Sequence, residues 1–143
     1  MMAIHPRKKI RDALIALLSA TPTAGANVLL DPVYELEESK LPCLVVHTGG
    51  EDIHDSTGAS HRTQERELHM AIEINALASD AVALDDALDA IASEIEAALA
   101  ADVRLGGTAL NSRMISLEKS VDKGDMPLGK LQINLLIDYV TEI

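Results

Sequence analysis

The chain has 143 residues and a net charge of −11, with one cysteine, two tyrosines and no phenylalanine or tryptophan. A single cysteine excludes an internal disulfide, and the acidic balance disfavours general binding to nucleic-acid phosphates. No apolar run reaches the roughly 18 residues of a membrane-spanning helix, and the first residues lack a signal-peptide pattern, so we expect a soluble, cytoplasmic protein without a membrane partner.

The first predicted element is a helix over residues 6–20. Pro6 suits the first helical position, and Thr21-Pro22 ends the helix because the residue before a proline avoids the α region. The apolar side chains that recur at helical spacing are Ile10, Ala13, Leu14, Leu17 and Leu18. This stripe predicts one face packed against the rest of the domain.

The start of this helix is basic. It carries Arg7, Lys8, Lys9 and Arg11, and no acidic residue occurs among the first eleven positions. Cations are unfavourable at the positive end of the helix dipole. Two interpretations stay open: a solvated cluster that is screened by salt, or a surface that contacts an acidic partner.

Short strands are predicted over 27–30 and 33–36, with the turn dipeptide Asp31-Pro32 between them. The compact apolar run over 43–48 predicts a strand in the centre of the sheet. Cys43 in this strand is most simply a small buried hydrophobe, because nothing in the sequence provides the electropositive setting of a reactive thiol.

Residues 49–64 form a polar connection, rich in Gly and Ser, between two strands. A linker of about 15 residues far exceeds the usual two to five of a hairpin. We interpret it as a protruding arm made of two strand extensions and a flexible tip.

The segment 67–77 alternates with a period of two, as a strand with one buried face does. Its apolar side chains are Leu68, Met70, Ile72 and Ile74, and its polar ones are Glu67, His69, Glu73 and Asn75. A helix over 80–101 follows, with Asp80 as its N-cap. Its apolar stripe is Leu84, Leu88, Ile91, Ile95 and Leu99.

This second helix carries acidic residues that no basic residue on the same helix neutralises. Asp85 and Asp89 are a like-charged pair one turn apart, and Glu96 continues the acidic surface. The surface is either solvated or faces the basic start of the first helix in a neighbouring copy.

Gly106-Gly107 breaks the chain, a strand is predicted over 110–121, and the last strand over 130–143 follows a turn. Strands that are neighbours in sequence and connect by turns imply antiparallel pairing. The prediction is therefore a single α+β domain over 1–143, with a mixed or mainly antiparallel sheet and two main helices packed on one face.

A search for chemistry finds no convincing site. Ser60, His61 and Asp55 are residue types of a nucleophilic triad, but they lie on a loop with nothing to hold them rigid. His54, Asp55 and His61 match no established metal-ligand spacing, with His47 and His69 on the flanking strands. We expect no metal, no cofactor and no catalysis, and interpret the chain as an interaction protein.

The order of these features resembles the tail terminator proteins of long-tailed bacteriophages, the minor tail protein U group. The matching parts are the leading helix Ile10-Arg-Asp-Ala-Leu-Ile-Ala-Leu-Leu, the strand Leu41-Pro-Cys-Leu-Val-Val entering Thr48-Gly-Gly-Glu, and the strand Glu67-Leu-His-Met-Ala-Ile-Glu-Ile. The helix containing Leu84-Asp-Asp-Ala-Leu and a final strand ending Leu136-Ile-Asp-Tyr complete the pattern. The near absence of aromatic residues departs from it.

The resemblance implies a virion protein, assembled in the host cytoplasm, that forms a homohexameric ring. Such a ring caps the tail tube, stops tube polymerisation and provides the surface to which the head attaches. Its partners would be further copies of itself, the tail-tube protein and head–tail connector proteins, with DNA passing through the lumen without specific binding. Alternatives are a head–tail connector or tail completion protein, or a small cytoplasmic α+β enzyme or ligand-binding domain whose site lies under the arm.

Two groups of residues are predicted to form the interfaces. The first, for subunit contacts, is Arg7, Lys8, Lys9 and Arg11 together with Asp85, Asp89 and Glu96. The second lies on the arm and is expected to touch the tube or the neighbouring subunit: Glu51, Asp52, His54, Asp55, His61 and Arg62.

Overall fold

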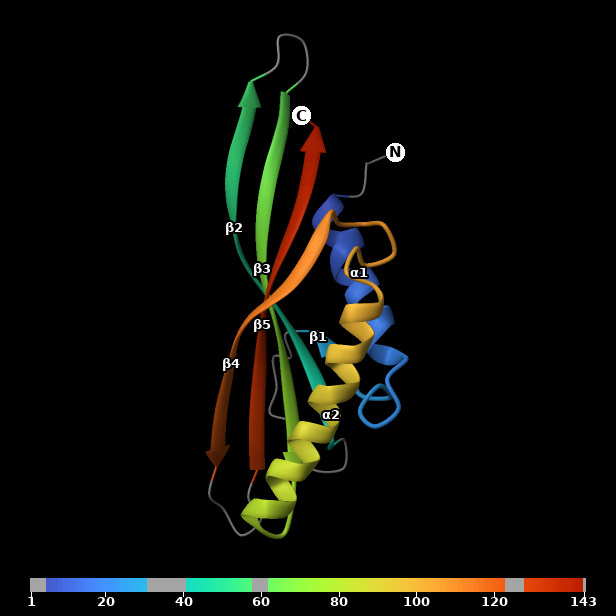
Figure 1. Cartoon of the computed structure of the whole chain (residues 1–143), viewed down its shortest axis with the longest axis vertical. Coiled ribbons are helices and arrows are strands. Elements are labelled where there is room, and N and C mark those ends of the chain that lie inside the picture. The colour runs from blue at the N-terminus through green and yellow to red at the C-terminus, as the bar shows by residue number, and fades with distance from the viewer. Residues whose placement is uncertain (1–4, 31–40, 58–61, 123–127, 143) are drawn as a thin grey trace.

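The computed structural model describes residues 5–30, 41–57, 62–122 and 128–142 (Figure 1). The elements in chain order are α1 (Pro6–Ser19), β1 (Val28–Leu30), β2 (Cys43–Thr57), β3 (Arg62–Leu77), α2 (Ala81–Ala101), β4 (Asn111–Asp122) and β5 (Leu128–Glu142). The predicted α+β class is confirmed. The strand predicted over 33–36 lies outside the described residues.

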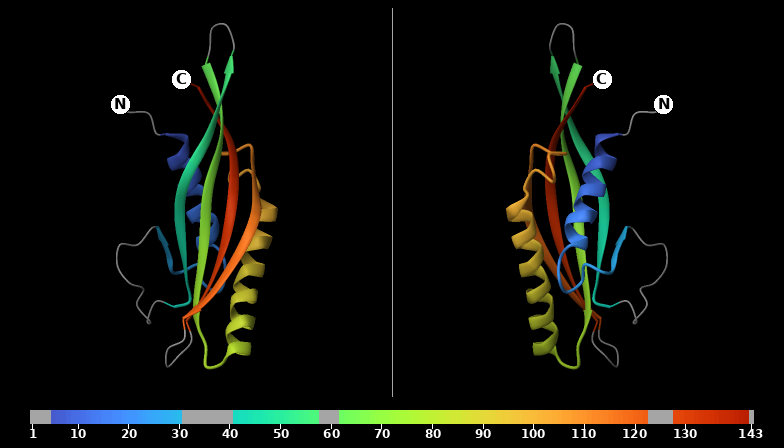
Figure 2. Two further views of the ribbon diagram at one scale, coloured as in Figure 1. Left: turned by 90° about the vertical axis from the view of Figure 1, so that its left-hand side faces the viewer. Right: turned by 90° about the vertical axis from the view of Figure 1, so that its right-hand side faces the viewer.

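The five strands form one open sheet in the order β1-β2-β3-β5-β4. β1 is parallel to β2, and every other neighbouring pair is antiparallel, so the sheet is mixed and mainly antiparallel, as predicted. β3 and β5 lie in its middle although α2 and β4 separate them in sequence. The sheet is strongly twisted, and both helices cover the same face (Figures 1 and 2).

Alternating side chains on the central strands form the core with the two helices. The four apolar residues predicted to share one face of β3 are all buried in this core, and so are the stripe residues of α2. Asn75 departs from the prediction of a polar, wet face. It is fully buried on the face away from the helices, where its side-chain amide donates to Glu73 at 3.0 Å.

Local side chains explain where both helices begin, and two glycines explain the turn that follows α2. His5 Nδ1 accepts from the Arg7 backbone N–H at 3.0 Å, and Asp80 accepts from that of Ala83 at 2.8 Å, so both helices are N-capped. After α2 the chain turns through Gly106 and Gly107 with φ of 67° and 83°. Glycine adopts these left-handed values without steric cost, which explains the predicted break.

The segment 49–64 is an arm of paired strands rather than a loop. β2 and β3 stay in register from Glu51↔Leu68 to Thr57↔Arg62, with a bulge between Thr48 and Glu51. The predicted strand extensions are confirmed, and residues 58–61 at the tip lie outside the described residues. The arm also contains a third strand that the sequence did not indicate, because β5 continues along β3 as far as Thr63↔Glu142. Figure 2 shows the arm rising beyond both helices.

Packing of α2 on the sheet predicts a large cost for truncating its buried stripe. Leu88 is 1% exposed, so Leu88→Ala should lower the free energy of unfolding by about 2–5 kcal/mol through lost burial and a residual cavity. Val82, on the same helix, is 72% exposed, and Val82→Ala should change it by less than about 0.5 kcal/mol. Urea titrations of both variants test this, and equal effects would contradict the packing described.

Candidate interface surfaces

A polar cluster lies where the arm leaves the body, on the sheet face that carries the helices. Glu51 follows the bulge in β2 and lies at the centre of this polar cluster. One carboxylate oxygen accepts from Arg7 of α1 at 2.9 Å and from Arg66 of β3 at 3.0 Å, and the other accepts from the Tyr139 hydroxyl of β5. One carboxylate therefore joins the start of α1 to three strands of the sheet.

Burial and hydrogen bonding compete at this cluster. The Glu51 side chain is only 7% exposed, which by itself raises the pKa of the carboxyl group. The hydrogen bonds from Tyr139, Arg7 and Arg66, together with the charge of Arg7, outweigh burial and lower the pKa of Glu51 below its ordinary value. Burial and the bond to Glu51 raise the pKa of the Tyr139 hydroxyl. The cluster thus holds an ionised carboxylate and a neutral phenol.

From this cluster a chain of hydrogen bonds continues into the arm. The other terminal N–H group of Arg66 donates to the side-chain oxygen of Gln64 at 2.7 Å, and the Gln64 amide N–H donates to Asp55 at 2.9 Å. Arg66 thus links the Glu51 carboxylate to Gln64. The polar side chains therefore connect the arm along its length to the edge of the core.

The other predicted arm residues are exposed or lie beyond the description. Asp52 and His54 point to the face away from the helices, and Asp52 lies 3.2 Å from the His69 ring. Asp55 is exposed and accepts a hydrogen bond from Gln64. His61 lies outside the described residues. Arg62 begins β3, but its side chain is not among those described.

The basic residues of α1 divide between internal pairs and solvent. Arg7 is bound to Glu51, and Lys8 pairs with Asp12 one turn later at 2.5 Å. Lys9 is exposed and Arg11 half-buried, and neither forms an ion pair with another described residue. Of the four, Lys9 is therefore the cation most available to a second molecule.

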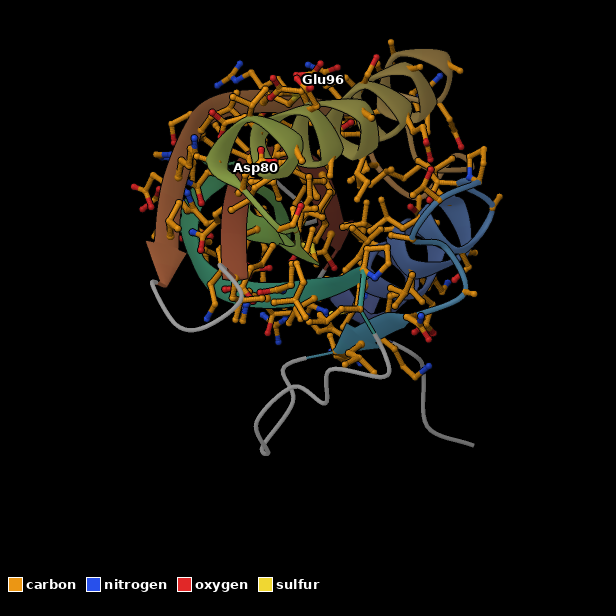
Figure 3. All side chains as sticks on the ribbon, turned by 90° about the horizontal axis from the view of Figure 1, so that it is seen from below. Asp80 and Glu96 are labelled. Atoms are coloured by element: carbon orange, nitrogen blue, oxygen red, sulfur yellow. The ribbon has the colours of Figure 1, made fainter. Side chains whose placement is uncertain are left out.

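The acidic residues of α2 also divide. Asp85 forms an ion pair with Lys119 of β4, whereas Asp89 and Glu96 are exposed. Figure 3 shows Glu96 further along α2 from Asp80, which caps the near end of the helix. Because α1 and α2 run in opposite directions, the basic turn of α1 and the Asp85–Asp89 turn lie at opposite ends of the body (Figure 1). They do not meet within one copy.

Sequence reasoning missed Arg66, Tyr139 and Lys119. Tyr139 occupies an apolar position in the alternation of the last strand, and Arg66 pairs with it in register. The bond between Tyr139 and Glu51 joins residues 88 positions apart. The one available signal was the placement of a lone tyrosine on the core side of a strand, since buried tyrosines usually need a hydrogen-bond partner.

Three further observations concern the residue types and the hollow that a small-molecule site would use. No group of three or more His, Cys, Asp or Glu side chains among them is placed to hold a metal ion. A hollow of about 340 Å³ beside α2 is lined mostly by apolar side chains, including Leu41, Pro42 and Ile91. Burial raises the pKa of the Cys43 thiol, as expected of a packing residue. Ser60, the candidate nucleophile, lies outside the described residues.

Comparisons with known proteins define the fold alone. A scan against protein-family models finds no match, and a search of curated proteins finds none either. A solved structure described only by a sequence identifier is 15% identical, with a TM-score of 0.53, over 92% of this chain and 94% of that chain. A chain from the virion of a native gene transfer agent particle is 17% identical over 93% of this chain and 91% of its own, but its TM-score of 0.34 is too low to support an inference. Within the described part of the chain, no helix is long and apolar enough to cross a membrane.

The Glu51 cluster predicts a pH-dependent contribution to stability. Because the pKa of Glu51 is lower in the folded protein than in the unfolded chain, ionisation stabilises the fold above the ordinary carboxyl pKa, and this stabilisation is lost as the pH falls through the lowered value. Glu51→Gln should lower the free energy of unfolding at pH 7 by about 1.5–3 kcal/mol, the range for hydrogen bonds to charged groups.

Urea titrations from pH 7 downwards test this. The variant should lose less stability on acidification than the wild type. The matched control is Glu65→Gln, which changes an exposed carboxylate on the neighbouring strand of the arm and should leave both the stability and its pH dependence almost unchanged. A Glu51→Gln profile parallel to the wild type would refute the role given to the carboxylate.

Proposed function

We propose that this chain is a structural subunit of a phage-type virion, and specifically that six copies form a ring that caps the tail tube. The observation that carries the proposal is the arm. It extends beyond the body, it is tied to α1 and β5 at its base, and it presents exposed polar side chains on both faces, with Asp52 and His54 on the face away from the helices and Asp55 on the other. A projecting, anchored hairpin of this kind is suited to contact a second protein.

The distribution of charge supports association between copies. Lys9 lies at one end of the body. Asp89 lies in the first half of α2, and α2 begins at the other end. Unlike charges on separate parts of one subunit favour head-to-tail contacts, and such contacts close into a ring when the rotation between copies closes. The sequence resemblance to tail terminators, in which the same elements occur in the same order, gives the ring its proposed place and its number of subunits.

In this role the chain acts without catalysis or cofactor. The ring ends polymerisation by occupying the last surface of the tube and presents its other surface to the head. A net charge of −11 per subunit lets DNA pass without adhering, because like charges repel. The protein would then be a virion component assembled in the host cell.

The proposal predicts a closed assembly in solution. Sedimentation velocity should give a species of about six subunits, and electron microscopy should show rings with a central hole. Cross-linking in a tail-assembly extract should then join the ring to tube protein. Capture of portal or adaptor protein instead would favour a head–tail connector, and a monomer at every concentration would overturn the ring.

Charge at the start of α1 predicts an effect on this assembly. Lys9→Glu removes the exposed cation of the first turn and should weaken ring formation at low salt, with the difference fading at about 1 M salt, where the screening length falls to roughly 3 Å. Arg104→Glu makes the same charge change at an exposed residue after α2 and serves as the control. Identical sedimentation of the Lys9→Glu and Arg104→Glu variants would rule out the subunit contact assigned to α1.

A further inference from the structure

β4 is an exposed edge strand of twelve residues. It pairs with β5 on one side, and no other described strand pairs with it on the opposite side. Its apolar side chains Ile115, Leu117 and Val121 are 49%, 51% and 41% exposed. Long, apolar edge strands with open backbone groups pair readily with another strand, and proteins usually cover them or break them with charge, proline or bulges. β4 contains one bulge, between Met114 and Ser116, no proline, and four charged residues, Arg113, Glu118, Lys119 and Asp122.

A second open edge lies on the opposite side of the same sheet. β1 pairs with β2 only from Leu44 to Val46, so residues 49–55 of β2 have no described strand along their outer side. Gly49 and Gly50 begin this stretch. A side chain at Gly50 would meet nothing within 4 Å on its face of the sheet, and the two glycines coincide with the bulge between Thr48 and Glu51.

The strand directions and registers determine how these two edges would meet. Because β2, β3, β5 and β4 alternate in direction, β4 runs antiparallel to β2. One row of paired residues crosses β2, β3, β5 and β4: Asp52↔Glu67, Glu67↔Asp138 and Asp138↔Asn111. Rotation about an axis along the strands would therefore bring Asp52 of one copy level with Asn111 of the next, with the two strands antiparallel.

Charge is complementary at this level. The row Asp52, Glu67 and Asp138 places three carboxylates side by side on the face away from the helices, and like charges on neighbouring strands are destabilising. Arg113 lies on that same face, two residues along β4 from Asn111. It is exposed and has no ion pair among the described residues. A neighbouring copy would thus add a cation at the open end of the acidic row.

From these observations we propose that the open edge of β2, at residues 49–55, pairs antiparallel with β4 of a second copy, and that Arg113 of one copy contacts Asp52 of the other. The pairing repeats from copy to copy and extends the sheet from each subunit into the next. The inference rests on the self-association in the proposed function, but not on the tail tube or on the number of subunits.

A charge exchange tests the pairing. Arg113→Asp and Asp52→Arg, made separately in the full chain, should each raise the dissociation constant of the assembly about tenfold or more, because each places like charges together at the interface. The double variant restores opposite charges and should sediment like the wild type. Arg104→Glu, outside β4, is the matched control and should not change the assembly. Circular dichroism verifies that each variant is folded.

A second measurement does not depend on charge. In a Cys43→Ser background, Asp52→Cys combined with Asn111→Cys, which the proposed register places directly opposite each other, should give a ladder of multimers on oxidation that collapses on reduction. Wild-type rings together with unaffected single variants, a double variant that stays dissociated, or no cross-linked ladder would overturn the edge pairing and leave the ring intact. A wild-type protein that never self-associates would overturn the proposed function and this inference with it.

Discussion

The contact that fixes the shape of this protein is the shared carboxylate of Glu51. A buried carboxylate is costly unless its oxygens are occupied, and here both accept from side chains on different elements. Arg7 connects the start of α1 to this carboxylate, Arg66 connects β3 to it, and Tyr139 connects β5 to it. Replacing such a group with well-packed apolar residues often costs little free energy, so its main effect is to specify geometry.

Much of the fold could be predicted because it depends on local periodicity. The alternation around Ile72 and the helical stripe through Leu88 each state which side of an element is buried, and the core confirms both. The arm was recognised from its length and polarity, and its strands are continuous with the sheet. Pattern could not show that β5 runs beside β3 into the arm, because strand order depends on contacts between residues far apart in the sequence.

The candidate interfaces were less accessible to sequence reasoning. The sequence predicts one group of basic residues at the start of α1. In the structure Arg7 forms an ion pair within the chain, whereas Lys9 is exposed. Likewise Asp85 is paired with Lys119, whereas Asp89 is exposed. These differences arise from which strand lies beside each helix end. The exposure of the apolar residues of β4 could not be predicted either. Its alternation is weak, and the sequence does not show that this strand lies at an edge of the sheet.

The position of β5 makes the rigidity of the arm depend on the docking of the last described strand. A hairpin of β2 and β3 alone lacks the contact from Tyr139 at its base. It also lacks the strand that pairs with β3 until β5 has docked. Isolated two-stranded hairpins are at best marginally stable in water. A partly folded chain in which β5 has not docked therefore lacks a rigid arm.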